Sequence, residues 1–291
     1  MELYFAPMAC SLATRIALYE AGAEAKFTAV DLKAKRTADG ADFFAVNPMG
    51  QVPVLRTETD GLITENPVVL LYVADHCPGS DLAPSHGAER YRLQLWLNFI
   101  TSELHKLVFI PLLSHKSNDG AKAFARDQIA LRFAYLNAHL DGREYLLDHF
   151  SVADAYLVTV LNWTRPAGID LTPWPALLAY FRRMHERASV AKAFAEEMAL
   201  YQEEQARARA MIGHVLEHDR VLCEQLARFR AQHRNLPHRV DGEEVCAAGG
   251  LLGLEIDGGE CGRRTGLVKR DASGERAGHR RKIKLHVSLL R

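Results

Sequence analysis

Cys10 stands at a position where its thiol could be chemically active. It follows a short apolar strand expected over residues 3–6 and precedes a helix expected to begin near Ser11. A thiol in that place meets the positive end of the helix dipole and unpaired backbone N–H groups, and both favour the thiolate. The apolar stripe of the helix begins at Leu12, so Cys10 belongs to the preceding turn. We therefore expect a functional thiolate here rather than the small buried hydrophobe that a free cysteine usually provides.

His105 lies among polar side chains on a long helix expected over residues 87–116. Asn98, Ser102 and His105 are spaced by four and three residues and so share one helix face, with Glu103 beside them. A histidine can exchange protons near neutral pH, but a single histidine on an amphipathic helix is more often structural. The spacing alone leaves both roles open for His105.

Glu65 and Asn66 follow a predicted β-hairpin. Its strands are expected over residues 52–57 and 62–65, joined by an Asp-Gly turn. Asn66 is then expected to open the next helix as its N-cap. Because free backbone N–H groups and the helix dipole meet at such a start, the position suits a carboxylate ligand.

The elements that position these residues form two groups. The pattern over residues 1–77 predicts a strand, a helix, a strand, a β-hairpin and a helix, which together make a small mixed sheet covered by helices. Strand signals end after a linker over residues 78–86. Helices are expected over residues 87–116, 121–140, 151–165, 174–187 and 189–200. The fold class is therefore an α/β domain followed by an all-α domain.

Ser151 and Asp154 form a predicted capping box before the apolar run AYLVTVL, and Phe150 could add a hydrophobic staple. We assign these residues to the fold rather than to catalysis.

The end of the chain has a different character. Residues 201–235 are compatible with a helix but charged on nearly every face, and glycines accumulate from Leu236 onward. Residues 261–291 carry many more basic than acidic side chains. Such a segment is too polar and too rich in glycine to form a core of its own, so we expect a partly disordered extension. Contact with nucleic acid or anionic lipid stays an alternative for this basic segment.

Composition limits the remaining possibilities. The 291 residues contain 36 Lys and Arg against 36 Asp and Glu, so charge gives no reason to expect a nucleic-acid or membrane partner for the core. Five cysteines without a C-x-x-C pair fit a reducing cytoplasm, and neither a leader nor a membrane-spanning run is evident. His214 and His218 lack a third ligand, and Cys246 and Cys261 lack a second pair, so we expect no metal site.

The order of elements, the segment NPMGQVPVL and the all-helical second part together resemble the glutathione transferases. The thiol at Cys10 resembles their bacterial beta class. The resemblance covers residues 1 to about 200. The motifs that carry it are ACSLA, NPMGQVPVL, TEN, TSELHK and SVADAYL. It implies a thioredoxin-like glutathione-binding domain over residues 1–80, an all-helical domain with a second-substrate site over 87–200, and an unmatched extension over 201–291.

The resemblance also implies how reduced glutathione would bind. A cis Val52-Pro53 bond would present the Val52 backbone to the cysteinyl part of the tripeptide. Asn66 and the amides beside it would hold the γ-glutamyl carboxylate, and Glu65 the ammonium group. Lys35 would hold the glycyl carboxylate. Asn66 departs from the Ser or Gly usual at this place in the family, which implies an altered affinity.

A homodimer is implied as well. His105 would face the Cys10 thiol in its own subunit. Asn98, Ser102 and Glu103 would reach the glutathione held by the partner subunit.

The second substrate, a hydrophobic electrophile, would meet an apolar wall beside the thiol. The resemblance implies Phe109, Leu112 and Trp163 for this wall, whereas Tyr156 is expected to be ordinary core.

The function implied is that of a cytoplasmic glutathione S-transferase with Cys10 and His105 as catalytic residues. Because a cysteine can also attack a disulfide, a thiol-disulfide or peroxide-reducing activity stays open. A non-catalytic binding or regulatory protein of the same fold is the other alternative. The joint presence of Cys10, Pro53, Glu65 and His105 disfavours it, since a scaffold would not need them all.

Overall fold

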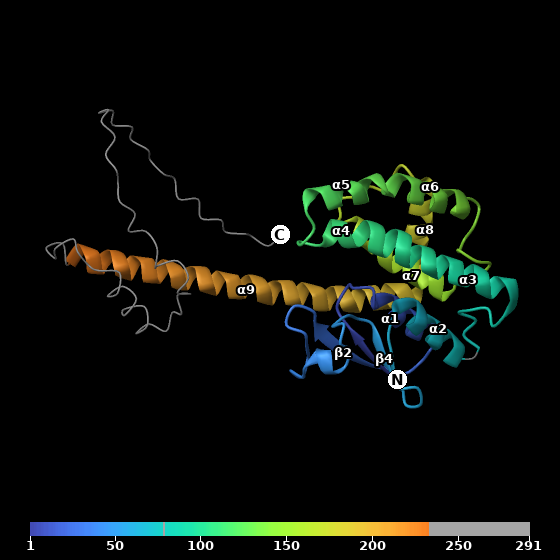
Figure 1. The fold of residues 1–291 in the computed structure, drawn as a ribbon, viewed down its shortest axis with the longest axis horizontal. Coiled ribbons are helices and arrows are strands. Elements are labelled where there is room, and N and C mark those ends of the chain that lie inside the picture. The colour runs from blue at the N-terminus through green and yellow to red at the C-terminus, as the bar shows by residue number, and fades with distance from the viewer. Residues whose placement is uncertain (78, 233–291) are drawn as a thin grey trace, which may run out of the picture. The chain divides into compact units, whose positions relative to one another are not determined.

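The computed structural model describes residues 1–77 and 79–232 (Figure 1). The chain divides into one compact unit, Met1–Glu217, and a second unit, His218–Arg291. Everything described below up to residue 217 belongs to the first unit. The basic segment expected to be disordered, Cys246 and Cys261 lie outside the described residues.

The N-terminal domain is built on a mixed sheet with the strand order β3-β2-β1-β4-β5. Its elements in chain order are β1 (Glu2–Phe5), α1 (Leu12–Glu20), β2 (Lys26–Asp31), β3 (Arg36–Thr37), the short 3₁₀ helix η1 (Phe43–Ala45), β4 (Val54–Arg56), β5 (Leu62–Ile63) and α2 (Asn66–His76). β1 pairs with β2 in parallel, and the other neighbours pair antiparallel. The predicted α/β fold is confirmed, and the short strand β3 within the polar stretch is an addition to it.

The central strand β1 shows why the sequence forms this sheet. Its side chains alternate between the two faces, as the pleat requires. Leu3 and Phe5 pack into the larger core with α1 and α2, whereas Tyr4 packs with Phe43 and Val54 in a smaller core on the other face. The apolar run at the start of the chain is therefore buried on both sides.

The predicted hairpin is present as β4 and β5. Arg56 pairs with Leu62, and Leu55 with Ile63. Gly61 in the turn has a φ of +74°, a left-handed conformation that glycine adopts without a steric penalty.

The second domain is all-helical, and α1 and α2 lie between it and the sheet (Figure 1). It comprises α3 (Gly87–Phe99), the π-helix η2 (Ile100–Phe109), α4 (Ile110–Leu113), α5 (Asp119–Asp127), α6 (Ile129–Leu140), α7 (Val152–Leu161), the 3₁₀ helix η3 (Asn162–Thr164), α8 (Pro175–Glu186) and the start of α9 (Ala188–Gln232). α7 is buried along its whole length and packs against α1. This contact joins the two domains of the first unit.

Three expected helices differ in detail. The helix expected over residues 87–116 ends at Leu113 and changes to π-helical hydrogen bonding between Ile100 and Phe109. The helix expected over 121–140 divides at Gln128. The last helix is longer than the expected 189–200, because α9 continues to Gln232. No helix within the described residues is long and apolar enough to cross a membrane.

The predicted capping box at the start of α7 is confirmed. The backbone N–H and the hydroxyl of Ser151 both donate to Asp154 Oδ2 at 2.9 Å, and the Ala153 N–H donates to Ser151 Oγ at 3.3 Å. The other carboxylate oxygen accepts from the Leu146 N–H and the Tyr180 hydroxyl. Asp154 is fully buried and its hydrogen-bonding capacity is used by the fold, as expected.

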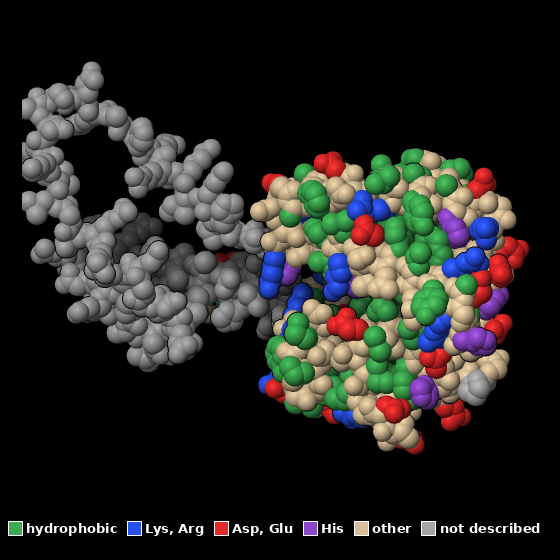
Figure 2. Space-filling view, turned by 45° about the vertical axis from the view of Figure 1, so that its right-hand side comes forward, with side chains coloured by type: hydrophobic (Ala, Val, Ile, Leu, Met, Phe, Trp, Pro, Cys, Tyr) green, Lys and Arg blue, Asp and Glu red, His purple; other side chains and the backbone are tan. Residues whose placement is uncertain are grey.

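The surface of the first unit mixes charges of both signs. On the face shown in Figure 2, basic and acidic side chains are interspersed rather than gathered into a patch of one sign.

Candidate active site

A cleft between the two domains brings six of the thirteen predicted site residues together. It encloses about 490 Å³ of empty space, which includes space open to solvent. Its lining combines the end of the β1–α1 turn, the segments before β4 and α2, and one face of η2 and α7. The lining residues used below are Cys10, Val52, Pro53, Glu65, Asn66, Thr101, His105, Lys106 and Tyr156.

Cys10 lies in the turn before α1, as expected, but it is a thiol rather than a thiolate. Its Sγ donates a hydrogen bond to the Val52 carbonyl at 3.2 Å. Burial raises the pKa of Cys10 to about 12, although the Lys106 cation and the backbone N–H groups of Cys10 and Ser11 act in the opposite direction. The expectation of a thiolate was wrong because desolvation of the sulfur outweighs the small stabilisation that a helix start offers.

The Val52-Pro53 peptide bond is cis, as predicted. Val52 is buried at the cleft, and its carbonyl accepts the Cys10 thiol. The Val52 carbonyl, two residues before β4, and the Cys10 thiol are therefore in direct contact.

The start of α2 differs by one residue from the prediction. Glu65 occupies the N-cap position with a φ of +66°, and no side chain caps the helix. Asn66, predicted as the cap, is the first helical residue and turns inward, where its Oδ1 accepts from the Thr14 hydroxyl at 3.5 Å and its Nδ2 has no partner. The backbone amides that an N-cap side chain would have engaged are thus left for another acceptor.

His105 is buried beside the thiol and paired with a tyrosine. Its Nδ1 lies 2.7 Å from the Tyr156 hydroxyl. Burial, with a smaller contribution from the Lys106 cation, lowers the pKa of His105 to about 4, so the imidazole is neutral near pH 7. Its ring also packs edge-on against Trp163, with 4.9 Å between the ring centroids.

The π-helix explains which side chains of this segment face the cleft. Hydrogen bonds from residue i to i+5 align side chains four and five positions apart instead of three and four. Thr101, His105 and Lys106 accordingly line the cleft together. Thr101 and Lys106 were not predicted as site residues. Thr101 lies four residues before His105 and would share its face in an α-helix too, whereas Lys106 joins that face through the wider spacing of the π-helix.

Asn98, Ser102 and Glu103 lie outside the lining of this cleft. Asn98 and Ser102 are exposed, and each donates to the carbonyl group four residues earlier in the helix. Glu103 accepts two hydrogen bonds from the Arg132 guanidinium at 2.9 and 2.6 Å. The structure does not bring these three residues to the thiol of their own chain.

Lys35 is also outside the cleft lining. Its ammonium group donates to the Gly50 carbonyl at 2.7 Å, and its backbone has a left-handed φ of +56°. The side chain is half-buried against the segment that precedes Val52.

The three residues expected to receive a second substrate are part of the packing behind His105. Phe109 is fully buried and Trp163 nearly so, and the two rings meet edge-on. Leu112 is half-buried against the same core. None of the three lines the cleft. Phe109 and Trp163 are packed into the core, as aromatic side chains commonly are.

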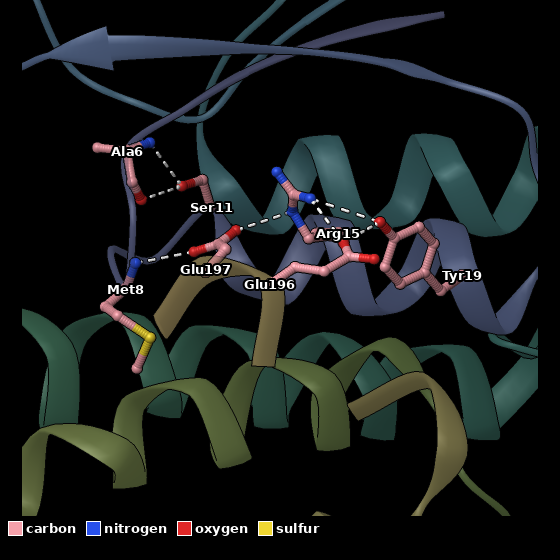
Figure 3. Close-up of polar contacts among 7 residues, drawn as sticks. All are labelled: Ala6, Met8, Ser11, Arg15, Tyr19, Glu196 and Glu197. Atoms are coloured by element: carbon pink, nitrogen blue, oxygen red, sulfur yellow. Dashed lines mark hydrogen bonds and ion pairs between the residues drawn. The ribbon is translucent and has the colours of Figure 1, made fainter. Parts of the chain in front are cut away.

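The loop that carries the thiol is held from both sides at Met8, which has a left-handed φ of +61°. The Met8 N–H donates to Glu197 Oε2 at 2.8 Å (Figure 3). The Met8 carbonyl accepts from the Trp163 indole N–H at 2.9 Å. Glu197 belongs to α9, so the last helix of the first unit fixes the turn before Cys10.

A buried ion-pair network extends from Glu197 along α1 (Figure 3). Arg15 Nε donates to Glu197 Oε1 at 3.0 Å, and Arg15 Nη1 donates to Glu196 Oε2 at 3.1 Å. The Arg15 guanidinium also lies over the rings of Phe5 and Phe27 at 4.3 and 4.0 Å from their centroids. Burial raises the pKa of Glu197 to about 7, against the opposing effect of the Arg15 cation.

This network was not predicted from the sequence. The available signal was an arginine at position 15 within the apolar stripe of the first helix. A buried arginine requires a carboxylate partner, but the sequence does not say which carboxylate it is.

No group of three or more His, Cys, Asp and Glu side chains in the described part of the chain could hold a metal ion. The side chains of His214 and His218, considered above as a metal site, lie outside the described part of the structure.

The fold agrees with comparisons to known proteins. Residues 1–75 match the family model "Glutathione S-transferase, N-terminal domain", and residues 100–188 match "Glutathione S-transferase, C-terminal domain". Glutathione S-transferase GstA of Escherichia coli O157:H7 is 39% identical over 199 residues, which cover 68% of this chain and 98% of that protein.

Solved structures give the same result. BphK, a bacterial glutathione S-transferase in a ternary complex, aligns with a TM-score of 0.66 and 46% identity over 68% of this chain and 99% of its own. A sphingomonad glutathione S-transferase complexed with glutathione aligns with a TM-score of 0.65 and 44% identity over 68% of this chain and 98% of its own.

The architecture is thus a thioredoxin-like α/β domain joined to a helical domain. The chain belongs to the glutathione S-transferase family, a family of transferase enzymes.

Proposed function

We propose that the protein conjugates reduced glutathione to hydrophobic electrophiles in the cleft beside Cys10. One observation carries this proposal: the strand end at Val52, the uncapped start of α2, and the Cys10 and His105 side chains converge on a single cleft. The sphingomonad relative and a Sulfitobacter homologue have been solved with glutathione bound, which supports the same ligand here.

The cleft offers a partner for each part of the tripeptide. The Val52 backbone suits the peptide groups of the cysteinyl residue, as in β-strand addition. The first-turn amides of α2 and the inward-facing Asn66 suit the γ-glutamyl carboxylate, and Glu65 suits the ammonium group. Lys35, now bonded to the Gly50 carbonyl, is the cation assigned to the glycyl carboxylate.

The proposed role of Cys10 and His105 is to stabilise the sulfur anion of glutathione. The thiol of glutathione releases its proton to water, and the resulting thiolate attacks the electrophilic carbon. A sulfur–carbon bond forms, and in an aromatic substitution the leaving group departs with its bonding electrons. On binding, the Cys10 hydrogen turns from the Val52 carbonyl to the anion, which frees that carbonyl for the peptide N–H of the cysteinyl residue. Cys10 with a raised pKa and a neutral His105 then serve as hydrogen-bond donors to the anion, and Lys106 adds a positive charge nearby.

The protonation of Cys10 favours this role over a redox role. Attack on a disulfide or a peroxide requires the thiolate of Cys10 itself. A thiol whose pKa is raised to about 12 supplies very little thiolate near neutral pH. Conjugation is therefore the activity that the site supports better.

The test compares three variants on two substrates. Cys10→Ser keeps a donor, Cys10→Ala removes it, and Cys77→Ser is the matched control at a cysteine outside the cleft. With a chloronitroaromatic electrophile we expect Cys10→Ser to retain most of the activity and Cys10→Ala to lose about tenfold, the cost of one hydrogen bond to a charged group. Equal loss in both variants, or reduction of a mixed disulfide as the main activity, would favour the redox role. Failure of the wild-type protein to bind immobilised glutathione would favour a non-catalytic protein.

We further propose that the protein is a cytoplasmic homodimer in which Asn98, Ser102 and Glu103 serve the partner's site. Their position outside their own cleft, with Asn98 and Ser102 exposed, supports this assignment. Sedimentation equilibrium should give twice the chain mass of 32.5 kDa. A fully active monomer would contradict the assignment.

A further inference from the structure

Tyr156 is a core residue whose hydroxyl reaches the active-site cleft. We propose that Tyr156 is a positioning residue that fixes His105 as the imidazole tautomer with its hydrogen on Nε2, so that His105 donates from Nε2 toward the sulfur. The sulfur as the recipient rests on the proposed function above, whereas the tautomer itself does not.

The contact between the two rings is close and rigid. Tyr156 is fully buried within α7, and its hydroxyl oxygen lies 2.7 Å from His105 Nδ1. The rings are perpendicular, with an interplanar angle of 89° and 6.1 Å between their centroids. Because α7 is buried along its whole length, the phenol has a fixed place from which to orient the imidazole.

The direction of this hydrogen bond follows from the hydrogens available. Burial raises the pKa of Tyr156 above its ordinary range, so the phenol keeps its hydrogen. Asn66 and Thr101 also face this hydroxyl. The free Asn66 Nδ2 is a donor and cannot accept the phenolic hydrogen. The Thr101 hydroxyl donates to the Leu97 carbonyl at 2.7 Å, and within the described residues it makes no hydrogen bond with the Tyr156 hydroxyl, which is paired with His105 Nδ1 alone.

The imidazole Nδ1 is therefore the acceptor placed to receive the phenolic hydrogen. A neutral imidazole carries one hydrogen, and an Nδ1 that accepts leaves it on Nε2. His105 is neutral near pH 7, as this tautomer requires, because burial and the Lys106 cation lower its pKa to about 4.

The other ring nitrogen of His105, Nε2, faces the cleft. Within the described residues Nε2 makes no hydrogen bond, and it is not among the buried polar atoms that lack a partner. His105 lines the cleft together with Cys10. An Nε2 hydrogen directed into this space stabilises a sulfur anion, whereas the other tautomer would present a lone pair and repel it.

The first experiment reads the tautomer without any ligand. Histidine ring ¹⁵N shifts of the full chain are recorded near pH 7, with the His105 signals assigned from the His105→Gln variant. We expect a protonated Nε2 and a bare, hydrogen-bonded Nδ1 for His105, and a mixture of tautomers in Tyr156→Phe. A protonated Nδ1 in the wild-type protein would overturn the proposal.

The second experiment asks whether Tyr156 acts through His105. The readouts are kcat for conjugation and the pKa of the bound glutathione thiol, followed by thiolate absorbance between pH 5 and 9. Loss of one orienting hydrogen bond in Tyr156→Phe should lower kcat about fivefold and raise the thiol pKa, with little change in KM. The charged and titratable groups that face this site, Cys10, Glu65, Lys106 and Glu197, are unchanged in every variant compared.

Two further variants separate positioning from structure. Tyr180→Phe removes another buried phenol hydroxyl from the helical domain, one that donates to Asp154 outside the cleft, and should leave the thiol pKa unchanged. In a His105→Gln background the amide supplies its own donor, so adding Tyr156→Phe should have no further effect on kcat.

An equal effect of Tyr156→Phe in both backgrounds would show that the tyrosine has only a structural role. If the wild-type protein binds no glutathione, the proposed function fails, and the ¹⁵N result still decides the tautomer.

Discussion

Cys10 donates its thiol hydrogen to the Val52 carbonyl. A thiol that carries its hydrogen can donate a hydrogen bond in the cleft, whereas a nucleophile would have to be the thiolate. The sulfur lies at a helix start, where the dipole lowers a thiol pKa. It is also desolvated, and desolvation raises the pKa to about 12. The larger of these two opposing effects decides the protonation state.

This protonation state predicts how Cys10 reacts with iodoacetamide. Since the thiolate is the reacting species, the alkylation rate should rise about tenfold per pH unit from pH 7 to 10 and reach no plateau. Peptide mass spectrometry after timed labelling measures the rate. A plateau near neutral pH would show that Cys10 is a stabilised thiolate and contradict its assignment as a donor.

His105 makes the stability of the protein depend on pH. The unfolded chain protonates this histidine near pH 6.5, whereas the folded protein does so only near pH 4. Between these values the unfolded state binds more protons, so the free energy of unfolding decreases as the pH falls from 6.5 to 4. The contribution lost is about 3 kcal/mol.

Urea unfolding at several pH values tests this linkage. His105→Gln should lose that part of the pH dependence, and the exposed His115→Gln is the matched control that should keep it. Identical pH profiles for wild type and His105→Gln would contradict the burial of a neutral His105.

Helix α9 fixes the loop of the thiol through Glu197, which receives the Met8 N–H and the Arg15 guanidinium. Removal of one partner of a buried ion pair leaves the other charge uncompensated. Glu197→Ala should therefore lower the free energy of unfolding by about 3 kcal/mol and raise the KM for glutathione, because the Cys10 turn loses its support.

Glu203→Ala on the same helix is the control for this prediction. Glu203 pairs with Arg207 on the exposed surface, where a salt bridge contributes little. Comparable destabilisation by Glu197→Ala and Glu203→Ala in chemical unfolding would refute the role given to the buried network.

Features set by neighbouring residues could be predicted from the sequence. The capping box joins Ser151 to Asp154, three residues apart, and the hairpin turn depends on a similarly short segment. Local propensity and turn chemistry carry this information. The cis bond before Pro53 and the meeting of Cys10 and His105 in one cleft were expected only from the resemblance to a known family.

Features set by distant residues could not be predicted. The Tyr156–His105 bond joins residues 51 positions apart, and the Arg15–Glu197 pair joins residues 182 positions apart. The change from an α-helix to a π-helix at Ile100 was not predicted either, since the apolar spacing of the segment fits an α-helix. Burial, which reversed the expected protonation of Cys10, is likewise a property of the assembled fold.

The whole cleft belongs to the unit Met1–Glu217, so this unit should suffice for glutathione binding. We expect a chain that ends after Glu217 to bind glutathione with the affinity of the full chain and to unfold at the same temperature. Calorimetry on both chains provides the measurement. A marked loss of affinity in the shorter chain would assign a function to the residues that follow.

The central claim is that the cleft binds glutathione and stabilises its thiolate with the donors Cys10 and His105. Ultraviolet difference spectroscopy of the full chain at pH 7, with glutathione added in steps, tests it most directly. We expect a saturable thiolate absorbance that is lost when Cys10→Ala and His105→Phe are combined. No thiolate signal in the wild-type protein, or a signal unchanged in the double variant, would contradict the account.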